Sequence, residues 1–141
     1  MNQYLKNLSK IEFVVTTACT GNCKHCSQGA KASPAQNISP ALAAELVNKV
    51  CAEYDIKTVM TFGGEPLLNS DAVFAVMTAA KNQAVPKRQL ITNGYFTNNT
   101  EIIRDTVKKL KECGVNDLLL SVDAFHQETI PLESVRFFAE Q

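Results

Sequence analysis

Three of the five cysteines in this chain stand within eight positions of one another. Cys19, Cys23 and Cys26 have the spacing C-x3-C-x2-C, and Gly21 lies between the first two. Three thiolates on one short loop can surround a single inorganic centre, either zinc or an iron–sulfur cluster. A closed zinc site needs a fourth ligand, which would have to be His25 or a distant residue. A cubane cluster held by three thiolates would instead keep one iron open. The spacing thus predicts a metal centre and leaves both metals possible.

The rest of the chain alternates short β-rich apolar runs with longer segments of helical spacing. The predicted strands are Ile11–Thr17, Lys57–Phe62, Arg88–Thr92 and Asp117–Val122. Strands that alternate with helices imply an α/β fold with parallel strands joined by right-handed crossovers. The runs show little apolar–polar alternation, which predicts a sheet covered on both faces. An open doubly wound sheet and part of a (β/α) barrel both fit this order.

Four helices are predicted from capping residues and apolar spacing. Ser39 is a favoured N-cap before Pro40, a second helix starts at Asn69 or Ser70, and a fourth starts at Pro131. A third starts near Asn98, which has capping-box spacing to Glu101, and ends at Gly114. The expected apolar faces are Leu42, Leu46, Val47 and Val50; Val73, Phe74, Val76 and Met77; Ile102, Ile103, Val107 and Leu110; and Leu132, Val135 and Phe138.

Polar and glycine residues follow each predicted strand, where α/β proteins bind their ligands. They are the cysteine loop after the first strand; Gly63, Gly64, Glu65 and Pro66 after the second; Asn93 and Gly94 after the third; and Ser121, Asp123, Phe125 and His126 after the fourth. The other two cysteines, Cys51 and Cys113, fall at the opposite end of the predicted sheet. We expect those two to pack as small apolar residues.

Two of these motifs together carry a family resemblance. The C-x3-C-x2-C triplet after a first strand, with Thr61-Phe62-Gly63-Gly64-Glu65-Pro66-Leu67 after the second, resembles the radical S-adenosylmethionine (SAM) superfamily. The ends of the third and fourth strands, Thr92-Asn93-Gly94 and Ser121-Val122-Asp123, are similar to those of the family. His25 stands where the family usually has an aromatic residue, which is an accepted variant. The resemblance runs from about Phe13 to Asp123.

The resemblance implies a fold, cofactors and an activity. The fold would be a partial, truncated TIM-like barrel, a single domain over residues 1–141 with its core at 11–138. Cys19, Cys23 and Cys26 would hold a 4Fe–4S cluster, and SAM would bind at Gly63, Gly64 and Glu65, with Asn93 and Ser121 as further cofactor-binding residues. Reductive cleavage of SAM would give a 5′-deoxyadenosyl radical that abstracts hydrogen from an unknown substrate. An electron donor such as flavodoxin or ferredoxin is implied as a partner. Neither the resemblance nor the residues identify catalytic groups, and Asp123 and His126 have no assigned role.

Length and composition set further expectations. A chain of 141 residues with 45% apolar residues suits one globular domain. The net charge of zero argues against binding to a nucleic-acid backbone, and no apolar run approaches the ~20 residues of a membrane-spanning helix. The polar start, Met1–Lys10, has no signal-peptide core. We therefore expect a cytoplasmic protein with reduced thiols.

The resemblance implies more βα units than the four that this chain supplies. The fourth predicted strand should then present an unpaired edge, through which the chain self-associates or docks on another polypeptide. We also expect little turnover by the chain alone, because later strands of the family contact the adenosine part of SAM. A non-catalytic metal-binding or interaction module and a zinc-binding structural domain remain the alternative functions.

Overall fold

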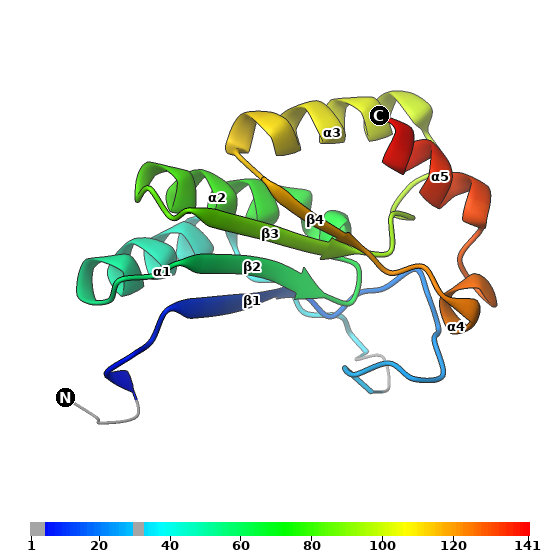
Figure 1. Ribbon diagram of the computed structural model, residues 1–141. Coiled ribbons are helices and arrows are strands. Elements are labelled where there is room, and N and C mark those ends of the chain that lie inside the picture. Colours follow the sequence, from blue (N-terminus) through cyan, green and yellow to red (C-terminus); the bar gives the residue numbers. More distant parts are fainter. Residues whose placement is uncertain (1–4, 30–32) are drawn as a thin grey trace.

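A computed structural model describes residues 5–29 and 33–141 of the chain (Figure 1). Residues 1–4, the start of the polar N-terminal segment, lie outside the described residues, as do residues 30–32. The chain forms a parallel sheet with strands in the order β1-β2-β3-β4. The strands are β1 (Lys10–Thr16), β2 (Thr58–Gly63), β3 (Lys87–Thr92) and β4 (Asp117–Leu120). This confirms the predicted parallel α/β fold.

Three long helices connect the strands and lie on one face of the sheet (Figure 1). They are α1 (Pro40–Glu53), α2 (Ser70–Asn82) and α3 (Thr100–Cys113). Sequential strand order with helices on one face is the arrangement of a (β/α) barrel, whereas a doubly wound sheet has helices on both faces. The sheet is therefore an arc of a TIM-like barrel. The prediction that both faces are covered was wrong, because none of the described helices lies against the concave face of the open arc.

The helix caps agree with the sequence except at α3. Ser39 Oγ accepts a hydrogen bond from Leu42 N at 3.3 Å and Pro40 follows it, as predicted. At α3 the N-cap is Asn99 rather than Asn98, because it is Asn99 Oδ1 that accepts from the backbone N–H groups of Glu101 and Ile102. Asn98 and Asn99 are adjacent and either can cap a helix, so the sequence alone does not fix the start of α3 to within one residue.

The core lies between the sheet and the helices. Val47, Val59, Val73, Met77 and Leu90 are among its fully buried residues. Four residues predicted on the apolar faces of helices are exposed instead, namely Leu42 (47%), Leu46 (37%), Ile102 (50%) and Leu132 (52%). Helices at an open arc have a free flank, and the buried faces of α1 and α3 are therefore narrower than their apolar stripes. Cys113 is buried as expected and Cys51 is partly buried.

The C-terminal segment differs most from its prediction. β4 ends at Leu120, and a short helix that the sequence did not indicate, α4 (Ala124–Gln127), follows it. The last helix, α5 (Leu132–Glu140), begins after Pro131, and it buries Val135 and Phe138. A Cβ on Gly94, in the loop after β3, would lie 3.3 Å from both of those side chains. α5 therefore packs over the carboxyl end of β3.

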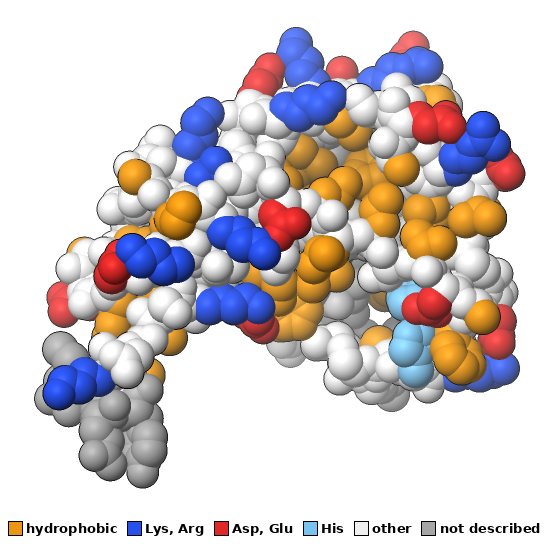
Figure 2. Space-filling model, viewed as in Figure 1, with side chains coloured by type: hydrophobic (Ala, Val, Ile, Leu, Met, Phe, Trp, Pro, Cys, Tyr) orange, Lys and Arg blue, Asp and Glu red, His pale blue; other side chains and the backbone are white. Residues whose placement is uncertain are grey.

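Within the described residues, β4 pairs with β3 alone, so its other edge is open. Leu118, Leu119 and Val122 are 43%, 44% and 48% exposed along this edge. Apolar side chains gather here and over the hollow beneath α3 and α5 (Figure 2). None of the described helices has the length and apolar character that crossing a membrane requires.

Candidate functional site

The carboxyl ends of the strands surround a pocket of about 500 Å³. Loops after all four strands line it, as parallel strand geometry predicts. The sequence-predicted residues among its lining are Cys19, Cys23, Cys26, Gly63, Gly64, Asn93 and Ser121. Glu65 is absent from the lining because it is fully buried beneath the pocket floor.

Gly63 and Gly64 bring the cysteine loop against the end of β2. A Cβ on Gly64 would lie 2.0 Å from the carbonyl oxygen of Ala18, and a Cβ on Gly63, whose φ is +148°, would lie 2.4 Å from that of Thr16. Two backbone hydrogen bonds join the two segments. Gly64 N donates to Thr16 O at 2.9 Å, and Glu65 N donates to Ala18 O at 2.7 Å. The paired glycines are thus required by the backbone that leads into Cys19, whatever ligand the pocket accepts.

The buried carboxylate of Glu65 joins the loops after β2 and β3. Its Oε1 accepts hydrogen bonds from Leu67 N (3.0 Å) and Thr92 Oγ1 (2.6 Å), and its Oε2 accepts one from Asn93 N (2.8 Å). Removal from water raises the pKa of Glu65, and this outweighs the hydrogen bonds, which act to lower it. The side chain therefore fixes the floor of the pocket, a role that the sequence did not reveal.

Asn93 links Glu65 to the cysteine loop through hydrogen bonds. Its Nδ2 donates to Thr20 Oγ1 at 3.1 Å and lies 3.9 Å from Cys19 Sγ, while its Oδ1 accepts from Tyr95 N. Thr20 Oγ1 in turn donates to the carbonyl of Tyr95 at 2.6 Å. Asn93 thus holds the first cysteine from the side of β3. Ser121, by contrast, is half-buried at the pocket wall, and its backbone N–H donates to Thr92 O.

The three cysteines form no disulfide in the structure and line the same pocket. Cys19 and Cys23 are half-buried and Cys26 is exposed. Cys19 Sγ accepts a hydrogen bond from Gly21 N at 3.3 Å. Burial raises the pKa of the Cys23 thiol, and the neighbouring Cys26 and Asp123 raise it further. Three sulfur donors on one pocket wall suit a thiolate-held metal centre.

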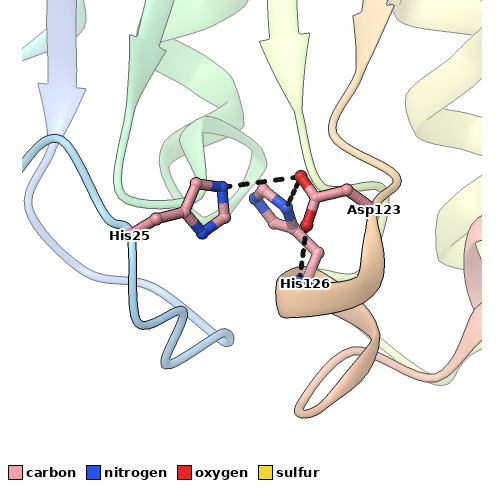
Figure 3. A group of neighbouring side chains, drawn as sticks. All are labelled: His25, Asp123 and His126. Atoms are coloured by element: carbon pink, nitrogen blue, oxygen red, sulfur yellow. Dashed lines mark hydrogen bonds and ion pairs between the residues drawn. The ribbon is translucent and has the colours of Figure 1, made fainter.

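A second group of side chains, which sequence reasoning left unassigned, ties the cysteine loop to α4. Asp123 Oδ2 lies 2.7 Å from His126 Nδ1 and 3.5 Å from His25 Nε2 (Figure 3). Nearby, Lys24 pairs with Glu128 at 3.0 Å. The sequence offers one indication of this group. The chain has two histidines, one inside the cysteine loop and one after the fourth predicted strand. Their meeting on one carboxylate depends on a contact across about a hundred residues, which spacing does not show.

The sequence of this chain is similar to a known protein family and to several of its members. The model of the radical SAM superfamily matches residues 13–138. A GTP 3′,8-cyclase of Desulforamulus reducens is 24% identical over 131 residues, which are 92% of this chain and 38% of that protein. A probable GTP 3′,8-cyclase of Methanocaldococcus jannaschii is 23% identical over 127 residues (90% and 40%), and a GTP 3′,8-cyclase of Aliarcobacter butzleri is 29% identical over 117 residues (82% and 34%).

The chain thus spans roughly two fifths of the length of these relatives. The matched region includes the second half of β1, the other three strands, the cysteine loop and the loops that dock it. Members of the superfamily use a 4Fe–4S cluster and SAM, and the thiol-lined pocket is consistent with both cofactors. The family match over nearly its whole length identifies the chain as a member of the radical SAM superfamily.

Proposed function

We propose that Cys19, Cys23 and Cys26 hold a 4Fe–4S cluster and that SAM binds beside it, at the loop from Gly63 to Glu65. The observation that carries the proposal is the docking of the two loops, because the Gly64 backbone lies against Ala18, next to the first cysteine. When bound, the cluster supplies one electron that cleaves SAM to methionine and a 5′-deoxyadenosyl radical, which takes a hydrogen atom from the substrate.

The residues of the protein position SAM and enclose it in the pocket. Backbone groups at Gly63, Gly64 and Glu65 receive the methionyl amine of SAM in this proposal, because Gly63 and Gly64 line the pocket together with Cys19. Asn93 and Ser121 stand on the pocket wall nearby and contribute further polar contacts. Met60, Phe62 and Ile91 line the concave side of the sheet within the same pocket and exclude water from that wall.

The partners of this chain follow from the same proposal. Cys26 is exposed, so an electron donor such as flavodoxin or ferredoxin can approach the cluster from that side of the loop. Reduced thiols and such a donor suit the cytoplasm. The substrate is an organic molecule that yields a hydrogen atom. GTP is the first candidate to test, because the relatives are named for its cyclisation.

The open edge of β4 provides the interaction surface. Leu118 and Leu119 in β4 and Val122 just beyond it are half exposed, and the outer backbone groups of β4 have no neighbouring strand among the described residues. Such an edge pairs readily with another strand. We propose that a second polypeptide strand completes it, and that the isolated chain turns over slowly or not at all until this happens.

Anaerobic reconstitution with iron and sulfide tests the cluster. The unmodified chain should take up stoichiometric iron and sulfide, whereas Cys19→Ala, Cys23→Ala and Cys26→Ala should each lose the cluster. Cys51→Ala is the matched control, because that thiol lies in α1, at the other end of the sheet. Stoichiometric zinc without iron, or a cluster that survives Cys23→Ala, would contradict the assignment.

SAM binding is tested separately on the reconstituted chain. Addition of SAM should change the electron paramagnetic resonance spectrum of the reduced cluster, and an unchanged spectrum at saturating SAM would count against the site. Production of 5′-deoxyadenosine, with and without GTP, then measures turnover. Sustained production by a monomer would show that the four βα units suffice.

A further inference from the structure

The chain has two histidines, and both lie against the same carboxylate. His25 comes from the cysteine loop and His126 from α4, and their ring centroids are 5.0 Å apart in an edge-on arrangement (Figure 3). One ligand atom from each ring and one oxygen of Asp123 all lie within 4.8 Å of one another. His25 and His126 thus come from distant segments and meet at Asp123. The proposed cofactor chemistry gives no role to these three side chains.

Asp123 is already oriented by the fold. Its Oδ1 accepts hydrogen bonds from the backbone N–H groups of Phe125 (2.9 Å) and His126 (3.0 Å) and so caps α4. Its Oδ2 lies near both rings, at 2.7 Å from His126 Nδ1 and 3.5 Å from His25 Nε2. The His25 ring also contacts Phe125, with centroids 4.9 Å apart. The carboxylate and the two rings are therefore held close together before any ligand arrives.

We propose that His25, Asp123 and His126 bind one divalent transition-metal ion, for which Zn²⁺ is the fitting example, through their own donor atoms, on the wall of the pocket that the cysteines also line. Zinc takes imidazole nitrogen at ~2.0–2.1 Å and carboxylate oxygen at ~2.0–2.2 Å, so three donors within 4.8 Å need only a small movement to meet around it. Two imidazoles select a transition metal over Mg²⁺ or Ca²⁺, which prefer oxygen ligands.

The exposure of the site suits a bound ion with open positions. His25 and Asp123 side chains are each 45% exposed and that of His126 is 18% exposed, so water can supply the remaining ligands. An ion here crosslinks the cysteine loop to α4. It acts alongside the Lys24–Glu128 ion pair and the hydrogen bond from Asn22 N to Thr129 Oγ1. The ion would thus order the loop without occupying its thiols.

The test removes the thiols first, so that they cannot compete for the metal. In the full chain carrying Cys19→Ser, Cys23→Ser and Cys26→Ser, Co²⁺ should bind at one equivalent, with visible d–d bands and no sulfur-to-cobalt charge-transfer band. Zn²⁺ should displace the Co²⁺. His25→Gln, His126→Gln and Asp123→Asn should each weaken binding at least tenfold. Asp123→Asn is informative because Asn also caps helices and keeps α4 in place.

Lys24→Gln is the matched control, because it removes another link between the same two segments and no proposed ligand. It should leave the Co²⁺ affinity within twofold. Should the triple serine variant fail to fold, the ring nitrogens of the two histidines can be followed by NMR in the unmodified apo chain. A second equivalent of Zn²⁺, added after the thiols are filled, should then shift both rings. No binding, or equal binding by the histidine variants, overturns the proposal. Neither experiment needs a cluster or SAM, so its failure would leave the proposed function standing.

Discussion

Glu65 is the buried acid that joins two loops, and its replacement by Ala should be among the most damaging changes at the site. In Glu65→Ala, the backbone N–H groups of Leu67 and Asn93 lose their acceptor, whereas the Thr92 hydroxyl can turn elsewhere. Each buried N–H left without a partner costs ~1–3 kcal/mol. The two together should lower the free energy of unfolding by about 4 kcal/mol. That is a large share of the ~5–15 kcal/mol of a typical domain.

Urea unfolding of the apo chain, followed by circular dichroism, measures this effect. Glu65→Gln should cost less, about 1–2 kcal/mol, because its amide oxygen can still accept from Leu67 N and Thr92 while its NH₂ faces Asn93 N. Glu12→Gln is the control, since Glu12 is exposed and pairs only with Lys10 on the surface of β1. It should change stability by less than ~0.5 kcal/mol. A Glu65→Ala chain within ~1 kcal/mol of the unmodified chain would refute the role given to this acid.

The pH dependence gives an independent check with a definite sign. Burial raises the pKa of Glu65 above its ordinary value of 4.5, so the folded state binds the proton more tightly than the unfolded state. The stability that Glu65 contributes is therefore present below pH 4.5 and is lost as pH rises through the raised pKa. Glu65→Gln has no such titration, so its deficit relative to the unmodified chain should shrink from pH 5 to pH 8. A deficit that grows over this range would mean that the hydrogen bonds outweigh burial.

Three further changes test the framework around the pocket. Gly64→Ala places a Cβ 2.0 Å from the Ala18 oxygen and should cost ~2 kcal/mol and most of the reconstituted iron. Gly29→Ala has a strained φ of +73° but no atom within 4 Å of its Cβ, so it should keep the iron. Asn93→Ala removes the bonds to Thr20 and Tyr95 and should cost ~1–2 kcal/mol in urea unfolding and weaken the response of the cluster spectrum to SAM. Leu119→Lys at the open edge of β4 should abolish concentration-dependent association in sedimentation velocity while changing the urea midpoint little, and association that persists would move the interface elsewhere.

Local pattern was enough to predict the frame of this fold. The first three strands were predicted to within one residue at each end, and β4 ends at Leu120, two residues before the predicted Val122. The parallel arrangement followed from strand–helix alternation, because a parallel pair needs a crossover between its strands. The faces of the helices were less predictable, since Leu42 and Ile102 have correct spacing but lie on flanks that an open arc leaves exposed.

At the site, the sequence indicated which residues gather but not what several of them do. The strand-end rule brings Cys19, Gly64, Asn93 and Ser121 to one pocket, as the structure has them. For Glu65 the sequence predicts cofactor binding through the backbone, and the structure shows in addition that its side chain links the floor of the pocket across 28 positions to Asn93. Whether a polar residue is buried depends on tertiary neighbours, and a single sequence does not display them.

The cysteine loop is held from three sides, and this explains why its conformation depends on the whole arc. Gly64 and Glu65 hold its start against β2, and Asn93 holds Thr20 against β3. The third support comes from beyond β4, where Thr129 accepts a hydrogen bond from Asn22 N across 107 positions. Cys19 Sγ takes part in the same network, because it accepts a hydrogen bond from Gly21 N at 3.3 Å and lies 3.9 Å from Asn93 Nδ2. Backbone and polar side chains thus fix the loop that carries the thiols. A cysteine triplet without α4 and the segment after it would lose one of the three supports that place its sulfur atoms.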